Sequence, residues 1–170
     1  MNDFEPDIET SFPLDILTGN LGDEHLIEFS LGYLMQARQI VLMSVLLWEG
    51  ASFLEQYNGV YDLRFGIRMK YMDKDWKVTP IDFTQAYKYS YIHPNNRETV
   101  RGLVVKAIVG LVKGVRPPVI TMSTFDAELP EPALVKYRVI EECLNGLGYR
   151  TVDAYRCPVG HDRWHFAAAT

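Results

Sequence analysis

A polar stretch in the middle of the chain carries residue types that bind phosphate. It reads RETVRG, from Arg97 to Gly102, and it follows the turn-forming sequence HPNN. The first turn of a helix has unpaired N–H groups and a partial positive charge, so phosphates bind there readily. A glycine in such a turn lets a ligand approach the backbone without a Cβ in between. Gly102, with Arg97 and Arg101, therefore predicts a phosphate site; a glycine that packs against a neighbouring element is the alternative.

Other side chains suited to catalysis follow two predicted strands. Tyr87, Tyr89 and Tyr91 share one face of a strand, where one of them can act as a base or all can form an aromatic packing face. Asp126 and Glu128 follow the next strand. They are suited to a cationic amine, or they are ordinary charges of a loop and a helix start.

Three potential metal ligands lie close together near the C-terminus, at Cys157, His161 and His165. Their spacing lacks a second pair of ligands and does not match the usual zinc patterns, so no metal site is predicted. His93 lies beside Pro94 and is expected to form a hydrogen bond at a strand end rather than act as a base. The sequence contains neither a P-loop nor a nucleophile elbow.

The composition is that of an ordinary globular domain. The 170 residues are 48% hydrophobic and 23% charged, and the net charge of −5 comes without a basic stripe, which argues against a nucleic-acid partner. Two cysteines and no secretory signal favour a reduced, cytoplasmic protein. The longest apolar run, Ile40–Trp48, is too short for a membrane span and is predicted to be a buried helix. A homo-oligomer is left open.

The apolar pattern divides the chain into an arm and one domain. Residues 1–22 are acidic and interrupted by prolines and glycines, so we interpret them as an N-terminal arm, and residues 23–170 as a single domain. Residues 23–57 are predicted to be helical, with Gly50 dividing them into two helices. The remaining predicted elements are strands at 63–71, 76–83, 85–92, 118–124, 149–156 and 163–169, and helices at 96–113 and 131–148.

This order of elements predicts an α+β fold. We expect a mixed, mostly antiparallel sheet of about six or seven strands with helices on both faces. The strands at 85–92 and 118–124 flank a helix in the sequence and are expected to be parallel neighbours, since such crossovers are right-handed.

The order over residues 23–168 resembles that of the GNAT superfamily of N-acyltransferases. In that family the fourth strand runs into a loop with Gln or Arg and two small residues, which opens the next helix and holds the pyrophosphate of coenzyme A. Arg97 and Gly102 match this motif, and Val100 stands where the first glycine is usual. The segments IHPNN and LNGLGYR are also similar to the family. The resemblance implies a site for acetyl-CoA or coenzyme A made of Ile92, Arg97, Glu98, Thr99, Val100, Arg101 and Gly102.

The resemblance also implies a reaction, N-acetylation of an amine on a small molecule or a protein. Many members use a tyrosine of the last helix as the acid, but Leu144 stands at that position here. Tyr137, two turns earlier on the same helical face, is the candidate catalytic residue, or a core residue. A catalytically degenerate GNAT-fold protein that serves as a binding or regulatory module is the alternative, and an unrelated α+β interaction protein is a third.

Val100 separates the two leading hypotheses. Valine is stiff and disfavours positive φ, so a loop that needs a glycine conformation would be rearranged by it. Asn95 and Glu98 have the spacing of a capping box, which favours a regular helix through this region. On this basis Val100→Gly is predicted to strengthen coenzyme A binding.

Overall fold

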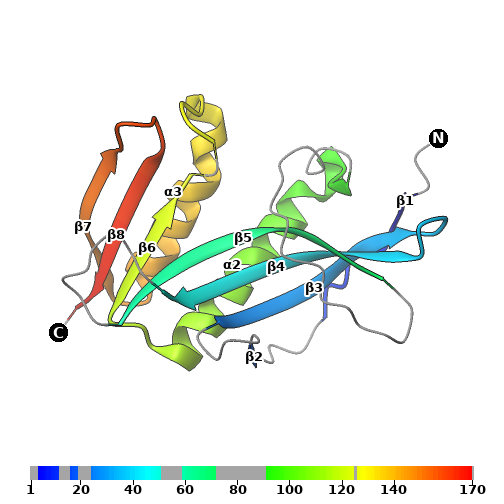
Figure 1. Ribbon diagram of the computed structural model, residues 1–170, viewed down its shortest axis with the longest axis horizontal. Helices are drawn as coiled ribbons and strands as arrows, with labels where there is room; N and C mark the ends of the chain where they lie inside the picture. The colour runs from blue at the N-terminus through cyan, green and yellow to red at the C-terminus, as the bar shows by residue number, and fades with distance from the viewer. Residues whose placement is uncertain are drawn as a thin grey trace. The chain divides into compact units, whose positions relative to one another are not determined.

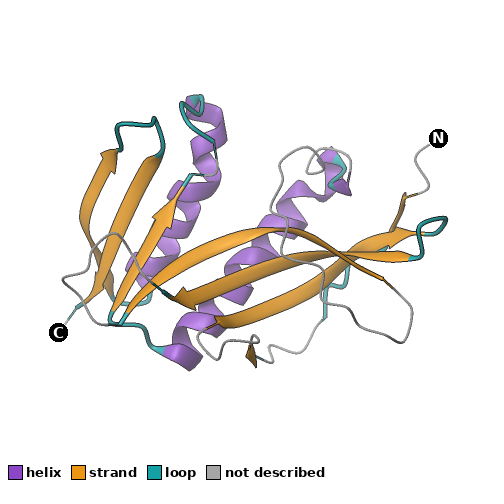
Figure 2. Ribbon diagram, in the orientation of Figure 1, coloured by secondary structure: helices purple, strands orange, loops and turns teal. Residues whose placement is uncertain are grey.

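The computed structural model shows an α+β chain with a mostly antiparallel sheet (Figures 1 and 2). It describes residues 4–11, 16–18, 24–50, 59–71, 91–124 and 126–169. The chain forms two compact units: the first comprises residues 1–15, 27–45 and 65–107, and the second comprises residues 16–26, 46–64 and 108–170. No helix in these ranges is long and apolar enough to cross a membrane.

The strands follow one another in the hydrogen-bonded order β1-β3-β4-β5-β6-β8-β7, and β2 pairs with β3 outside this path. The strands are β1 (Phe4–Pro6), β2 (Leu17–Thr18), β3 (Glu24–Leu34), β4 (Gln39–Glu49), β5 (Val60–Tyr71), β6 (Val119–Ser123), β7 (Tyr149–Arg156) and β8 (Asp162–Ala168). The helices are the 3₁₀ turn η2 (Pro94–Asn96), α2 (Arg97–Val115) and α3 (Glu131–Gly146).

The prediction of helices over residues 23–57 is wrong for the residues that the structure describes. β3 and β4 form a hairpin there, joined by a turn in which Arg38 has a φ of 50° and donates its N–H to Met35 O at 3.2 Å. The apolar run Ile40–Trp48 is a strand buried on both faces, as its pattern along β4 shows. Short apolar runs suit a buried strand as well as a buried helix, so periodicity alone does not separate them. The expectation of helices on both faces depended partly on these residues.

The first unit holds one end of the β3–β4 hairpin. Here β1 pairs antiparallel with β3, from Phe4 opposite Leu34 to Pro6 opposite Gly32. These two strands lie so close together that a Cβ atom on Gly32 would be 2.2 Å from the backbone oxygen of Glu5. The apolar core side chains of this unit come from β3, β4, β5 and the first half of α2, and include Ile27, Phe29, Leu31, Val41, Met43, Val45, Ile67, Val100, Leu103, Val104 and Ala107.

The second unit contains the parallel pair of the sheet. β5 pairs parallel with β6, from Val60 opposite Val119 to Leu63 opposite Met122, and β8 pairs antiparallel with the other edge of β6. The prediction that a strand at 85–92 is the parallel neighbour of β6 is therefore wrong, because β5 and β8 occupy the two edges of β6. Most of that strand, and all of the one predicted at 76–83, lies outside the described residues, and at Tyr91 the chain is helical.

The C-terminal elements agree with the sequence. The predicted strands at 63–71, 118–124, 149–156 and 163–169 and the helices at 96–113 and 131–148 correspond to β5, β6, β7, β8, α2 and α3. β7 is last in the strand order, pairs only with β8 among the described strands, and has a register shift between Thr151 and Asp153. Its side chains are largely exposed, including Val152 and Tyr155.

Candidate functional site

The start of α2 is formed by a 3₁₀ turn that runs directly into the α-helix. His93 precedes this turn, and its Nδ1 accepts the Asn95 N–H at 3.3 Å. The His93 carbonyl accepts the Asn96 N–H at 2.8 Å, and the Arg97 N–H donates to Pro94 O. His93 is thus the hydrogen-bonding residue that the sequence predicted, but at a helix start rather than a strand end. The capping box is absent, because the Glu98 carboxylate pairs with Arg101 instead.

The first two turns of α2 have a buried face and an exposed face. Val100 is in helical conformation, as predicted, and only 4% exposed. Gly102 is exposed, and a Cβ atom added to it would meet no atom of the described residues within 4 Å. Residues two apart on a helix differ by about 200° around its axis, so these two lie on opposite faces. The packing alternative for Gly102 has no support in the residues that the structure describes.

The charged residues of this turn are only partly available to a ligand. Arg97, Glu98 and Thr99 are exposed, and Ile92 just ahead of them is half-buried. The Arg101 guanidinium donates a hydrogen bond to the Glu98 carboxylate, and this bond lowers the pKa of Glu98. A phosphate would have to compete with Glu98 for Arg101, whereas Arg97 is exposed at the first residue of α2.

The candidate acid lies in the core of the second unit. Tyr137 is 2% exposed, and its ring stacks on Trp164 with centroids 5.5 Å apart and planes 9° from parallel. The Lys136 ammonium lies 5.0 Å from the Tyr137 ring centroid. Leu144, at the family position for the acid, is fully buried. This geometry favours the core role of Tyr137.

The loop after β6 is tied to the turn between β7 and β8. Thr124 Oγ1 donates to Asp126 O at 2.9 Å and accepts the Asp162 N–H at 3.0 Å. Glu128, with a φ of 54°, donates its N–H to Gly160 O at 2.9 Å. These contacts involve the backbones of Asp126 and Glu128 and hold the loop in place, and the half-buried Asp126 is less accessible to an amine than Glu128.

The possible metal ligands near the C-terminus do not converge. His161 Nδ1 lies 2.8 Å from Thr124 O, while His165 packs edge-on against Tyr155 at 5.6 Å between ring centroids. Cys157 is buried in the turn between the strands. Among the described residues, no group of three or more His, Cys, Asp and Glu side chains could hold a metal ion.

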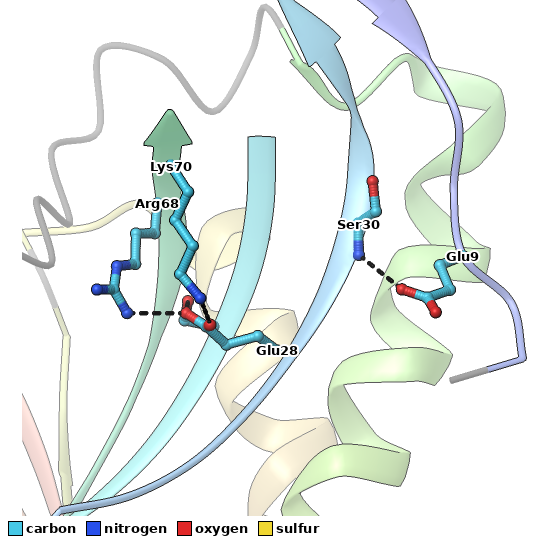
Figure 3. A network of polar contacts seen from close by, with 6 residues as sticks. Glu9, Glu28, Ser30, Arg68 and Lys70 are labelled. Atoms are coloured by element: carbon cyan, nitrogen blue, oxygen red, sulfur yellow. Dashed lines mark hydrogen bonds and ion pairs between the residues drawn. The ribbon is translucent and has the colours of Figure 1, made fainter. Parts of the chain in front are cut away.

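A buried ionic cluster in the first unit was missed by the sequence analysis (Figure 3). Glu28 on β3 accepts hydrogen bonds from Ser44 Oγ at 2.7 Å, from Arg68 Nη1 at 3.0 Å and from Lys70 Nζ. The side chains of Glu28 and Arg68 are 6% and 5% exposed. Burial alone would raise the pKa of Glu28, but the hydrogen bonds from Lys70 and Ser44 and the nearby positive charges outweigh it and leave that pKa lowered.

The sequence predicts the cations of this cluster on one face of a strand, but not the carboxylate that they bind. Alternation on the predicted strand at 63–71 places Arg64, Arg68 and Lys70 on one face, which was interpreted as the solvent side. The sequence predicts Glu28 in a helix, so no carboxylate is expected opposite these cations.

Comparisons with family models, with curated proteins and with solved structures found no match. The functional argument therefore depends on the chain's own residues.

Proposed function

We propose that this protein is an acyl-CoA-dependent N-acetyltransferase of GNAT type that binds acetyl-CoA at the start of α2 and acts on an amine of a small molecule or a protein. The observation that carries this proposal is the parallel pairing of β5 with β6, the two described strands that flank α2 in the sequence. The resemblance to the family requires such a pair around the phosphate-binding helix. β5 ends at Tyr71 and α2 begins at Arg97, so β5 has the parallel pairing expected of the family's fourth strand but does not run directly into the helix as that strand does.

The first turns of α2 support binding of the coenzyme A pyrophosphate. The exposed face at Gly102 has open space where a side chain would project, so a ligand bound at the first residues of α2 can extend along the helix there without a clash. Arg97 is exposed on the preceding turn and adds positive charge next to the positive end of the helix dipole. In this proposal side chains contribute more than the sequence suggested, because the Arg97 N–H is already bonded to Pro94 O.

A pair of matched glycine variants tests the binding site. Gly102→Glu places a long acidic side chain in the proposed phosphate site, and Gly146→Glu makes the same change at an exposed glycine of α3 that also has no neighbour within 4 Å of its Cβ position. Coenzyme A is expected to raise the melting temperature of the unmodified protein and of Gly146→Glu, but not of Gly102→Glu. Equal shifts in all three proteins would remove the start of α2 as the site.

The burial of Tyr137 and Leu144 favours a second candidate function, a GNAT-fold protein that binds an acyl-CoA without catalysing transfer. Neither side chain is exposed to receive a substrate, since they are 2% and 0% exposed. Release of free coenzyme A thiol from acetyl-CoA in the presence of a mixture of amines separates the two functions. Thiol release above the rate without protein supports the enzyme, whereas binding without release supports the module.

A further inference from the structure

The guanidinium group of Arg68 has one hydrogen-bonding edge in use and another that is unoccupied. Nη1 donates to Glu28 Oε1 at 3.0 Å. Nε and Nη2 are buried and have no hydrogen-bond partner in the part of the chain that the structure describes. Nε–H and the adjacent Nη2–H project in parallel from one side of the group, which is the geometry that binds both oxygens of a carboxylate.

Glu28 cannot fill this second edge. Its Oε1 already accepts from Ser44 and Arg68, and its Oε2 accepts from Lys70. The cluster therefore holds one negative and two positive charges, with Arg68 only 5% exposed. Buried charges in proteins are normally paired and their N–H groups satisfied, so this edge, in a cluster that is net positive among the described residues, favours an anionic partner.

We propose that the Nε–Nη2 edge of Arg68 binds the carboxylate of a small organic molecule. A planar monoanion matches the two parallel donors and brings the cluster to neutrality, whereas a phosphate dianion would leave it with a net negative charge.

This site is independent of coenzyme A binding, because all of its residues lie on β3, β4 and β5 and none lies at the start of α2. A failure of the acetyltransferase proposal would leave it standing. The shared chemistry is a carboxylate, and acetate is the simplest probe for it.

The Nε–H resonance of Arg68 in protein labelled with ¹⁵N-arginine reports directly on this edge. Acetate is expected to shift this resonance in a saturable way with an affinity on the order of millimolar, and chloride at the same ionic strength is expected not to. The spectrum of Arg68→Lys identifies the resonance, since Lys keeps the positive charge opposite Glu28 but lacks the paired donors. If the variant fails to fold, thermal stabilisation of the unmodified protein by acetate but not by chloride still tests the proposal.

Thermal stabilisation by acetate provides the second measurement. Arg68→Lys is expected to weaken acetate binding about ten- to a hundredfold, because two charge-assisted hydrogen bonds are lost. Arg64→Lys is the control, since Arg64 lies on the same strand but is 45% exposed and paired with Asp62 at 2.6 Å. Equal responses to acetate and chloride, or no response to acetate, would overturn the proposal. A response to inorganic phosphate that exceeds the response to acetate would overturn the assignment to carboxylates.

Discussion

Gly102 lies in the first turns of a helix with no packing contact that requires a glycine. Because a Cβ atom there meets no described atom within 4 Å, Gly102→Ala is expected to raise the free energy of unfolding by about 0.5–1 kcal/mol. Urea unfolding measures this. Gly114→Ala in the same helix is the comparison, and should gain less because its Cβ would lie 2.3 Å from Ile16 Cδ1. If Gly102 serves a cofactor, the stabilised alanine variant should also bind coenzyme A more weakly; an unchanged affinity would argue against that role.

Val100 leads to a different expectation from the one its sequence position suggested. Its side chain is 4% exposed and belongs to the core, so its methyl groups do not crowd the exposed face of α2. Val100→Gly is therefore expected to lower the free energy of unfolding by about 3 kcal/mol, from the cavity and from the low helix propensity of glycine. Calorimetry should show no gain in coenzyme A affinity. A tighter complex would restore the earlier view of Val100 as an obstacle to the ligand.

Glu28 should make stability depend on pH in the acid range. The pKa of Glu28 is lower in the folded chain than in the unfolded one, so the unfolded chain takes up the proton first as the pH falls. The contribution is complete above about pH 4.3 and is lost as the pH falls through the lowered folded value.

Glu28→Gln isolates this effect. It leaves Arg68 and Lys70 partly buried without their counter-charge, which should cost about 3–5 kcal/mol at neutral pH. The difference in the free energy of unfolding between the two proteins should shrink as the pH falls below about 4.3, the pKa of an unperturbed glutamate, and through the lowered pKa of Glu28. A difference that stays constant over this range would mean that Glu28 is not the titrating group.

In the first turn of α2, the Glu98 carboxylate competes with an anionic ligand for Arg101. Glu98 holds Arg101 through an exposed ion pair, and both ends of the pair are accessible to solvent. Glu98→Gln removes a negative charge from the helix start and releases Arg101, so coenzyme A binding should strengthen and become more sensitive to salt. Titrations at two ionic strengths measure both effects. Binding that weakens would show that Glu98 itself contacts the cofactor.

The helices could be predicted from the sequence more closely than the β3–β4 hairpin. Helices α2 and α3 were predicted within a few residues because their ends carry local signals, such as Pro132 near one start and the glycines that follow. The β3–β4 hairpin was not, since its apolar runs suit a buried helix as well as a strand buried on both faces. Alternation grouped Arg68 with Lys70 correctly. It could not show that this face is covered, because burial depends on elements that are distant in the sequence.

At the scale of the whole molecule, the net negative charge is opposed to the anionic ligands that we propose. The chain has a net charge of −5, which disfavours anionic ligands at long range. Both proposals nevertheless require an anion to bind, and each rests on local positive charge, at Arg97 or at Arg68 with Lys70, rather than on the overall balance. The composition argues against a nucleic-acid partner, but an overall composition cannot reveal a single buried guanidinium.

The register shift in β7 bears on whether the molecule can polymerise. β7 ends the strand order, and a strand in that position can template another chain through its free backbone groups. Here Thr151 lies opposite Phe166 and Asp153 opposite His165, so Val152 is an extra residue that interrupts the ladder. Deletion of Val152 should restore an unbroken edge and promote fibrous aggregates, visible by light scattering at high protein concentration. A deletion variant that stays monodisperse would show that the bulge does not act as a gatekeeper.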